Sequence, residues 1–234
     1  MYEKHASIDT PSDKTVIWRY MNLEKVIALL STRELFLCRL DKFIDPWEGV
    51  WPRCFVEEIR ENWPSDDAND LFTMSNWMRD KFFVNCWHEN NHESAALWDQ
   101  YAKTAGLAIC TTVGRLKESI SDKRTVYIGR IEYLDYAKDT VPEVNLFIPP
   151  FIKRKSFQHE NEIRVMFFDS SDVTSESTSH NHSLQVDLQI LIQDVYLSPT
   201  LENWVIPHIK ELLARYGLSS ITPKKSDLYA PHVY

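Results

Sequence analysis

Three charged side chains alternate along one segment in the second half of the chain. Glu160, Glu162 and Arg164 are spaced by two residues within the segment 158–168. Since alternate side chains of a strand share a face, the three should point the same way. Two carboxylates and a guanidinium could bind a polyhydroxylated or phosphorylated ligand, and a carboxylate with a raised pKa could act as acid or base. The alternative is a solvated strand face with a cross-strand ion pair.

A second group of charged residues comes early in the chain. Arg19 lies between two aromatic residues in an apolar stretch, and Arg is suited to bind phosphate or carboxylate as a fork. It could equally pair with Asp45, Glu48 or Glu162 and stabilise the fold. Asp45 and Glu48 could orient Arg19 or a ligand. Asp-Pro-Trp-Glu-Gly at 45–49 is also a typical turn sequence, which is the simpler explanation.

Aromatic residues and a basic run give two further candidates. Trp87, Trp98 and Tyr101 could form a wall for a nicotinamide or another base, although aromatic residues at helical spacing more often face the core. The run 153–155, Lys-Arg-Lys, could contact phosphates. More often three consecutive charges form a solvated helix end.

The segment 88–92, His-Glu-Asn-Asn-His, matches the HExxH signature of zinc hydrolases. That chemistry needs both His side chains on one helical face, one turn apart. The two preceding residues are typical of a strand end, and the next helix is expected to begin near Glu93, after the motif. Glu118 is the candidate third ligand. We expect no metal site here.

The elements that would position these residues alternate without a regular βαβ order. Strands are expected at 15–20, 35–39, 82–87, 107–110, 125–134, 158–168, 184–188 and 191–197. Helices are expected after Asn22, within 52–81 with a break near 64–67, and at 93–103, 112–120 and 203–216. This order predicts an α+β fold with a mixed or antiparallel split sheet and flanking helices. We expect a flexible tail at 1–14, a single domain at 15–234 and a mobile insertion at 169–183.

Composition excludes several classes of function. Lys and Arg number 26 against 34 Asp and Glu, a net charge of −8, so general nucleic-acid binding is not expected. With five Gly, the chain contains neither GxGxxG nor a P-loop. Four widely spaced Cys suggest reduced thiols. No signal peptide or membrane-spanning run is recognised, so a cytoplasmic protein without a membrane partner is expected.

Several segments taken in order resemble a bacterial domain family of unknown function. They are Arg19-Tyr20-Met21, Phe43-x-Asp45-Pro46-x-Glu48, Cys86-Trp87-His88, Glu93-Ser94-x-x-Leu97-Trp98-x-x-Tyr101, Gly106-x-x-Ile109 and Lys155-x-x-x-x-Glu160-x-Glu162-x-Arg164. The match spans roughly residues 15–228, and its specificity lies in the order and spacing of the segments. The family implies no reaction.

The early Arg and the late Glu-x-Glu are also similar to the layout of ADP-ribosyltransferases. That similarity implies NAD as a substrate, with Arg19 contacting it and Glu162 stabilising the positive ribose. The Ser-Thr-Ser strand and the His-Tyr pair of that superfamily are missing. Our first hypothesis is therefore a nucleotide-binding enzyme that cleaves NAD or transfers ADP-ribose, in a toxin or phage-defence context. The alternatives are a ligand-sensing or protein-interaction module without catalysis and, third, a zinc hydrolase.

Overall fold

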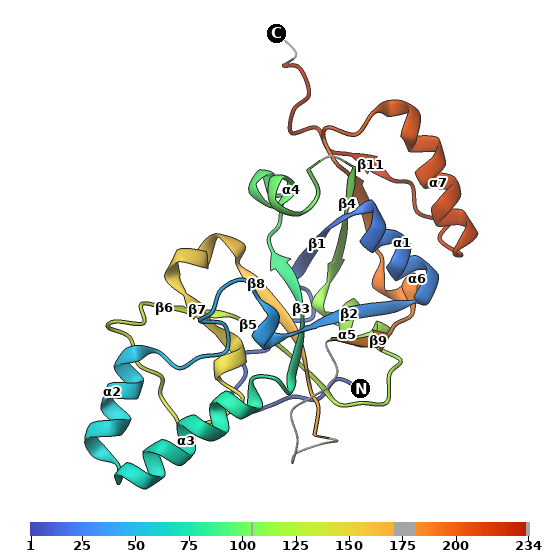
Figure 1. Cartoon of the computed structure of the whole chain (residues 1–234). Helices are drawn as coiled ribbons and strands as arrows, with labels where there is room; N and C mark the ends of the chain where they lie inside the picture. The colour runs from blue at the N-terminus through green and yellow to red at the C-terminus, as the bar shows by residue number, and fades with distance from the viewer. Residues whose placement is uncertain (104, 171–180, 233–234) are drawn as a thin grey trace. The chain divides into compact units, whose positions relative to one another are not determined.

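The structure is a computed structural model that describes residues 1–103, 105–170 and 181–232. It contains helices, a mixed and mostly antiparallel sheet, and a separate small parallel sheet, which confirms the expected α+β class (Figure 1). Contacts within the chain define two compact units. The first unit comprises Met1–Pro11, Phe36–Cys86 and Arg124–Ser183, and the second comprises Ser12–Leu35, Trp87–Lys123 and Leu184–Tyr234. The expected single domain stays a prediction.

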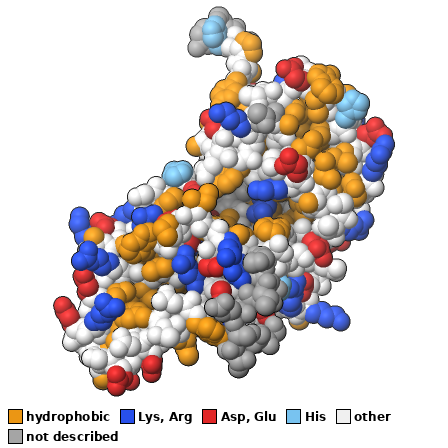
Figure 2. Space-filling view, viewed as in Figure 1, with side chains coloured by type: hydrophobic (Ala, Val, Ile, Leu, Met, Phe, Trp, Pro, Cys, Tyr) orange, Lys and Arg blue, Asp and Glu red, His pale blue; other side chains and the backbone are white. Residues whose placement is uncertain are grey.

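The first unit combines antiparallel strand pairs with two consecutive helices. Its elements are the end of β2 (Glu34–Arg39), η1 (Leu40–Lys42), α2 (Arg53–Asn62), α3 (Ser65–Met78), most of β3 (Phe82–Glu89), β5 (Val126–Arg130), β6 (Glu132–Leu134), η2 (Pro149–Phe151), β7 (Ile152–Arg154), η3 (Lys155–Glu160), β8 (Glu162–Phe168) and the start of β9 (Asn181–Gln185). Strand β8 pairs with β3 and antiparallel with β5, while β6 and β7 form the parallel pair. Figure 2 shows side chains of both charges interspersed with hydrophobic ones around α2.

Local chemistry explains most boundaries in this unit. The helical run is broken as expected, but at Trp63 and Pro64 only, because α3 already begins at Ser65 directly after the proline. The strand expected at 158–168 begins only at Glu162. The preceding residues form η3, and Asn161 adopts the left-handed conformation at φ 38°, where Asn is tolerated. Glu160 therefore does not lie on the strand with the other two charges, which corrects that expectation.

Part of the segment 1–14 makes specific contacts within the first unit, and the flexibility expected for this tail stays a prediction. Tyr2 forms a parallel bridge with Val126, and the Arg130 amide donates to the Asp9 carbonyl at 2.9 Å. Ile8 is buried in a hydrophobic cluster with Met166 and other residues of this unit. An apolar side chain that fills a core stabilises such contacts, and a polar composition alone did not reveal them.

The second unit is built around a four-strand antiparallel path. Its elements are β1 (Val16–Asn22), α1 (Leu23–Thr32), the end of β3, α4 (Ala95–Tyr101), β4 (Gly106–Thr112), α5 (Val113–Ser119), α6 (Leu188–Leu191), β10 (Asp194–Leu197), η4 (Asn203–Val205), α7 (Ile206–Arg215) and β11 (Lys224–Lys225). Strand β1 pairs antiparallel with β4 and with the end of β3, β4 with β10, and the short β11 runs parallel to β10.

Capping residues set the helix ends of this unit as expected. Asn22 accepts a hydrogen bond from the Lys25 amide and begins α1, and Gly217 adopts φ 84° just after α7. The strand expected at 184–188 is instead β9, which ends at Gln185, and Leu188 begins a short helix. Of the expected insertion 169–183, residues 171–180 lie outside the described residues. Among the helices that the structure describes, none has the length and apolar character needed to span a bilayer.

Candidate functional site

Five charged side chains of the first unit converge on one another and form what we call the ion cluster. Its members are Glu48, Lys153, Glu160, Glu162 and Arg164. They come from the turn after η1, from β7, from the end of η3 and from β8. Four of the five are buried, and the Arg164 side chain is 0% exposed. The expected solvated strand face is therefore wrong, because both faces of β8 are covered.

Arg164 has a hydrogen-bond acceptor for each of its three nitrogens. Its Nε and Nη2 donate to the two carboxylate oxygens of Glu162, at 2.5 and 3.1 Å. Nη2 also donates to Glu48 at 2.9 Å, and Nη1 donates to the Pro150 carbonyl at 2.7 Å. A bidentate pair of this kind satisfies a buried guanidinium. Arg164 thus donates four hydrogen bonds within the protein, and with 0% exposure it does not present a fork to a ligand.

The Lys153 ammonium lies among three carboxylates. Its Nζ is 2.9 Å from Glu48, 2.5 Å from Glu160 and 3.4 Å from Glu162. The residue is buried on β7, whereas a solvated helix end was expected for the run 153–155. A buried ammonium needs close acceptors, and the three carboxylates supply them.

Burial and ion pairing act in opposite directions on these groups. Burial alone would raise the pKa of Glu162, but the charges of Arg164 and Lys153 outweigh it and lower the pKa to about 2. Burial would lower the pKa of Lys153, yet the neighbouring carboxylates raise it above its ordinary value. Glu162, Lys153 and Arg164 therefore all stay charged near neutral pH. A lowered pKa makes Glu162 a poor candidate for the raised-pKa carboxylate that acid–base chemistry would need.

The turn at 45–49 delivers Glu48 to the cluster. The Asp45 side chain accepts a hydrogen bond from the Trp47 amide at 3.1 Å, and the Glu48 amide donates to the Asp45 carbonyl at 3.2 Å. Gly49 follows at φ 69°, a conformation that favours glycine. The expected turn is confirmed. Both carboxylates of the turn have partners: Asp45 accepts a hydrogen bond from Arg154 at 2.7 Å, and Glu48 accepts one from Arg164.

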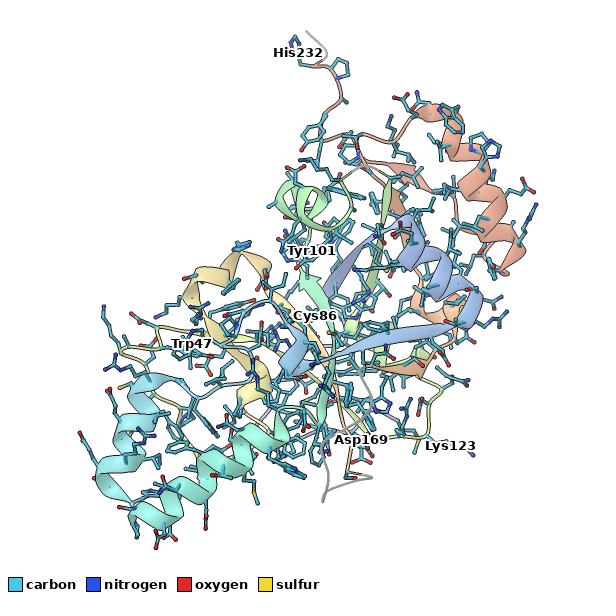
Figure 3. All side chains as sticks on the ribbon, viewed as in Figure 1. Trp47, Cys86, Tyr101, Lys123, Asp169 and His232 are labelled. Carbon is cyan, nitrogen blue, oxygen red and sulfur yellow. The ribbon has the colours of Figure 1, made fainter. Side chains whose placement is uncertain are left out.

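A pocket of about 470 Å³ lies in the same unit, and we call it the Trp47 pocket. Its lining residues are Trp47, Arg53, Leu134, Asp135, Tyr136, Ala137, Arg154, Lys155 and Ser156. Trp47, labelled in Figure 3, is 41% exposed. The Arg154 guanidinium lies over the rings of both Trp47 and Phe157, at 5.9 and 5.5 Å. The pocket therefore combines an exposed aromatic ring with cations.

Two buried polar atoms of this lining have no hydrogen-bond partner among the described residues. They are the hydroxyl of Tyr136 and the Nε of Arg154. Burial, followed by the charge of Glu48, raises the pKa of Tyr136, so its phenol stays protonated and keeps a hydrogen to donate. Unsatisfied buried polar groups are uncommon in native proteins, and each calls for an explanation, such as a partner that is not part of the chain.

The other predicted site residues lie in the second unit. Arg19 on β1 has its guanidinium 5.8 Å from the Trp87 ring. Trp98 is 1% exposed, meets Tyr20 edge-on at 5.0 Å and donates from its indole nitrogen to Glu93 at 2.8 Å, whereas Tyr101 is 45% exposed. Trp98 thus packs in the core, and the two rings do not form a shared wall. The approach of Arg19 to Glu162 stays a prediction.

The HENNH segment does not have the geometry of a zinc site. His88 and Glu89 lie on β3, and the next helix begins at Ala95. The two His side chains therefore do not share a helical face. Across residues 1–103, 105–170 and 181–232, no group of three or more His, Cys, Asp or Glu side chains is arranged to hold a metal ion.

Sequence reasoning missed Lys153 as the centre of a charge cluster, and Trp47 and Tyr136 as pocket residues. The one available signal was the position of Trp47 within a turn sequence. Comparisons of the chain with protein-family models, with curated proteins and with solved structures found no match. The resemblances to the bacterial domain family and to ADP-ribosyltransferases therefore stay predictions, and the function has to be argued from the site itself.

Proposed function

We propose that the chain binds a small molecule that combines a flat ring with an anionic group, such as a nucleotide, in the Trp47 pocket. The observation that carries this proposal is the pair of partnerless buried donors, the Tyr136 hydroxyl and the Arg154 Nε, in the lining of that pocket. A donor without a partner in a cleft favours an acceptor supplied by a ligand. Phosphate and carboxylate oxygens are such acceptors.

Charge and shape support the same class of ligand. The lining carries three cations, Arg53, Arg154 and Lys155, against one carboxylate, Asp135. The cations have protein partners of their own, so an anion would share them rather than meet free charges. An exposed indole offers a face for base stacking, and the volume of about 470 Å³ falls in the range of small-molecule sites.

The ion cluster fixes the positions of two residues that line this pocket. Lys153 and Arg154 are adjacent on β7, so anchoring the first among carboxylates fixes the position of the second. Glu48 and Trp47 are adjacent in the turn, and the Arg164 pair fixes that turn in the same way. Binding residues held by rigid neighbours lose less freedom when a ligand arrives.

Binding without turnover is the function we favour over cleavage of NAD. Stabilising a positive ribose requires a carboxylate that touches the ligand, and Glu162 is not in the pocket lining. Its oxygens already accept hydrogen bonds from Arg164 and Lys153. Its lowered pKa does keep it ionised, as cleavage would require. Binding and cleavage can be separated by incubating the protein with NAD and measuring released nicotinamide by chromatography. Nicotinamide release by the wild type that is lost in Glu162→Gln would favour the enzyme.

Isothermal titration calorimetry with AMP, ADP-ribose and ribose 5-phosphate tests binding. We expect the two adenine ligands to bind, and Trp47→Ala and Arg154→Met to weaken that binding by about tenfold or more, equivalent to at least about 1.4 kcal/mol. Trp204→Ala and Arg215→Met are the matched controls, because both side chains are exposed in the second unit. If neither adenine ligand binds, or if the controls weaken their binding as much, the proposal is wrong.

A further inference from the structure

The second unit contains a larger and more polar pocket, which we call the Arg115 pocket. Its volume is about 680 Å³, and its lining residues are Arg115, Gln189, Ile192, Gln193, Asp194, Gly217, Leu218, Ser219, Ser220, Ile221, Thr222 and Lys224. Buried Ile192 and Leu218 contribute apolar surface. Hydroxyl and amide side chains come from five further lining residues, Gln189, Gln193, Ser219, Ser220 and Thr222. This mixture of many hydrogen-bonding groups with little aromatic surface differs from that of the Trp47 pocket.

The charges of the lining leave one cation in excess. Lys224 forms an ion pair with Asp194 at 2.7 Å, so the two charges offset each other. Arg115 donates from Nη2 to the Gln189 carbonyl at 3.0 Å, and a carbonyl carries no formal charge to neutralise it. Its Nε is buried and has no hydrogen-bond partner in the described parts of the chain. In a protein with a net charge of −8, a local positive excess of this kind favours an anion.

Hydrogen bonds hold the rim of this pocket in place. The Gln189 side chain donates to the Gly217 carbonyl at 3.1 Å, which connects α6 to the end of α7. The Leu218 amide donates to the Leu213 carbonyl at 3.0 Å, and the Ile221 amide to the Leu218 carbonyl at 3.1 Å. The loop that carries Ser219, Ser220 and Thr222 therefore has a defined backbone. Fixed hydroxyl groups lose little freedom when they bind.

We infer that the Arg115 pocket binds a small anionic polyol, of which a sugar phosphate is the simplest kind. Arg115 would bind the anionic group, since a guanidinium suits phosphate oxygens in particular. The side chains of Ser219, Ser220, Thr222, Gln189 and Gln193 would exchange hydrogen bonds with the hydroxyl groups. This inference is independent of the Trp47 pocket, because the two pockets lie in different units and favour different ligands.

The test is calorimetric titration of the full chain with glucose 6-phosphate, glucose and inorganic phosphate. We expect glucose 6-phosphate to bind most tightly, phosphate more weakly and glucose weakest, because the anionic group provides the anchor. Arg115→Met should weaken glucose 6-phosphate binding by about tenfold or more, as loss of a charge-assisted hydrogen bond does. Arg215→Met is the matched control: it removes the same charge from an exposed position on α7, where Arg215 pairs with Glu211.

A second variant guards against a folding defect in Arg115→Met. Ser220 is exposed on the pocket rim, so Ser220→Trp should fill the pocket and leave the melting temperature unchanged. It should abolish glucose 6-phosphate binding while AMP binding at the Trp47 pocket is retained. The inference is overturned if wild-type protein binds none of the three probes, if glucose binds as tightly as its phosphate, or if Ser220→Trp binds like wild type.

Discussion

The guanidinium of Arg164 donates to the carboxylate of Glu48 at 2.9 Å across 116 residues of sequence, with both side chains buried. The pair joins a tight turn to β8. Because the same carboxylate lies 2.9 Å from Lys153, one residue of the turn compensates two buried cations. Glu48, like Glu162, therefore compensates both buried cations of the ion cluster, and its loss would leave each of them with fewer acceptors.

Replacing Glu48 with Ala should strongly destabilise the protein. Arg164 and Lys153 would stay buried with fewer acceptors, and removing one partner of a buried ion pair typically costs about 3–5 kcal/mol. Urea unfolding followed by circular dichroism measures this loss. Glu211→Ala removes an exposed carboxylate that pairs with Arg215, and its effect on stability should be much smaller. Equal effects of the two substitutions would contradict a stabilising role for the cluster.

The lowered pKa of Glu162 predicts a specific acid sensitivity. A carboxyl group with a lower pKa in the folded state contributes stability above its unfolded pKa and loses it as pH falls through the folded pKa. For Glu162 this window runs from about pH 4.5 down to about pH 2. Unfolding free energies measured at several pH values should fall within it for the wild type. Glu162→Gln should be less stable at neutral pH and show a shallower acid slope. An unchanged slope would show that Glu162 does not set it.

The packing of the N-terminal segment can be tested at Ile8. Ile8→Ala removes a buried side chain from a hydrophobic cluster, so we expect a loss of about 2–4 kcal/mol. Ile44→Ala is the matched control, because Ile44 is 102% exposed in the same unit. Its effect should be within about 0.5 kcal/mol. A loose tail would instead make both substitutions nearly neutral in thermal unfolding.

Trp98 and Tyr101 should respond differently to truncation. Trp98→Ala opens a cavity and removes the donor to Glu93, which should cost about 3–5 kcal/mol in stability. Tyr101→Ala should change the free energy of unfolding by less than about 1 kcal/mol, because Tyr101 is 45% exposed and its truncation opens no closed cavity. Chemical denaturation of both variants checks this. Comparable losses would mean that Tyr101 also packs in the core.

Local patterns predicted much of the fold and little of the site. Asn22 and Gly217 set helix ends through interactions within a few residues, and the Asp45–Gly49 turn is likewise local. Such features follow from residue type. The ion cluster instead depends on which distant segments meet. Nothing near Lys153 in the sequence indicates that Glu48 will face it, so its burial could not be inferred from the basic run alone.

The two-residue spacing of charges at 160–164 predicted a strand start that the backbone conformation of Asn161 does not allow. The Glu-x-Glu-x-Arg pattern suits one continuous strand, but the left-handed Asn161 separates Glu160 from β8. Glu160 still reaches the cluster, through Lys153 rather than through a shared strand face. The spacing therefore correctly predicted that Glu160, Glu162 and Arg164 lie close together, but it wrongly placed all three on one strand.

Each unit consists of three separated stretches of chain, and the last of them lies in the second half of the sequence. Neither unit can therefore complete its fold when only the first half of the chain has been synthesised. Ile8 leaves the ribosome long before Met166, with which it shares a core, so its side chain stays exposed to water until its partners are synthesised. A topology dominated by distant pairings folds slowly. We expect refolding from denaturant to be slow and sensitive to protein concentration, and nascent chains to depend on chaperones that shield this early segment.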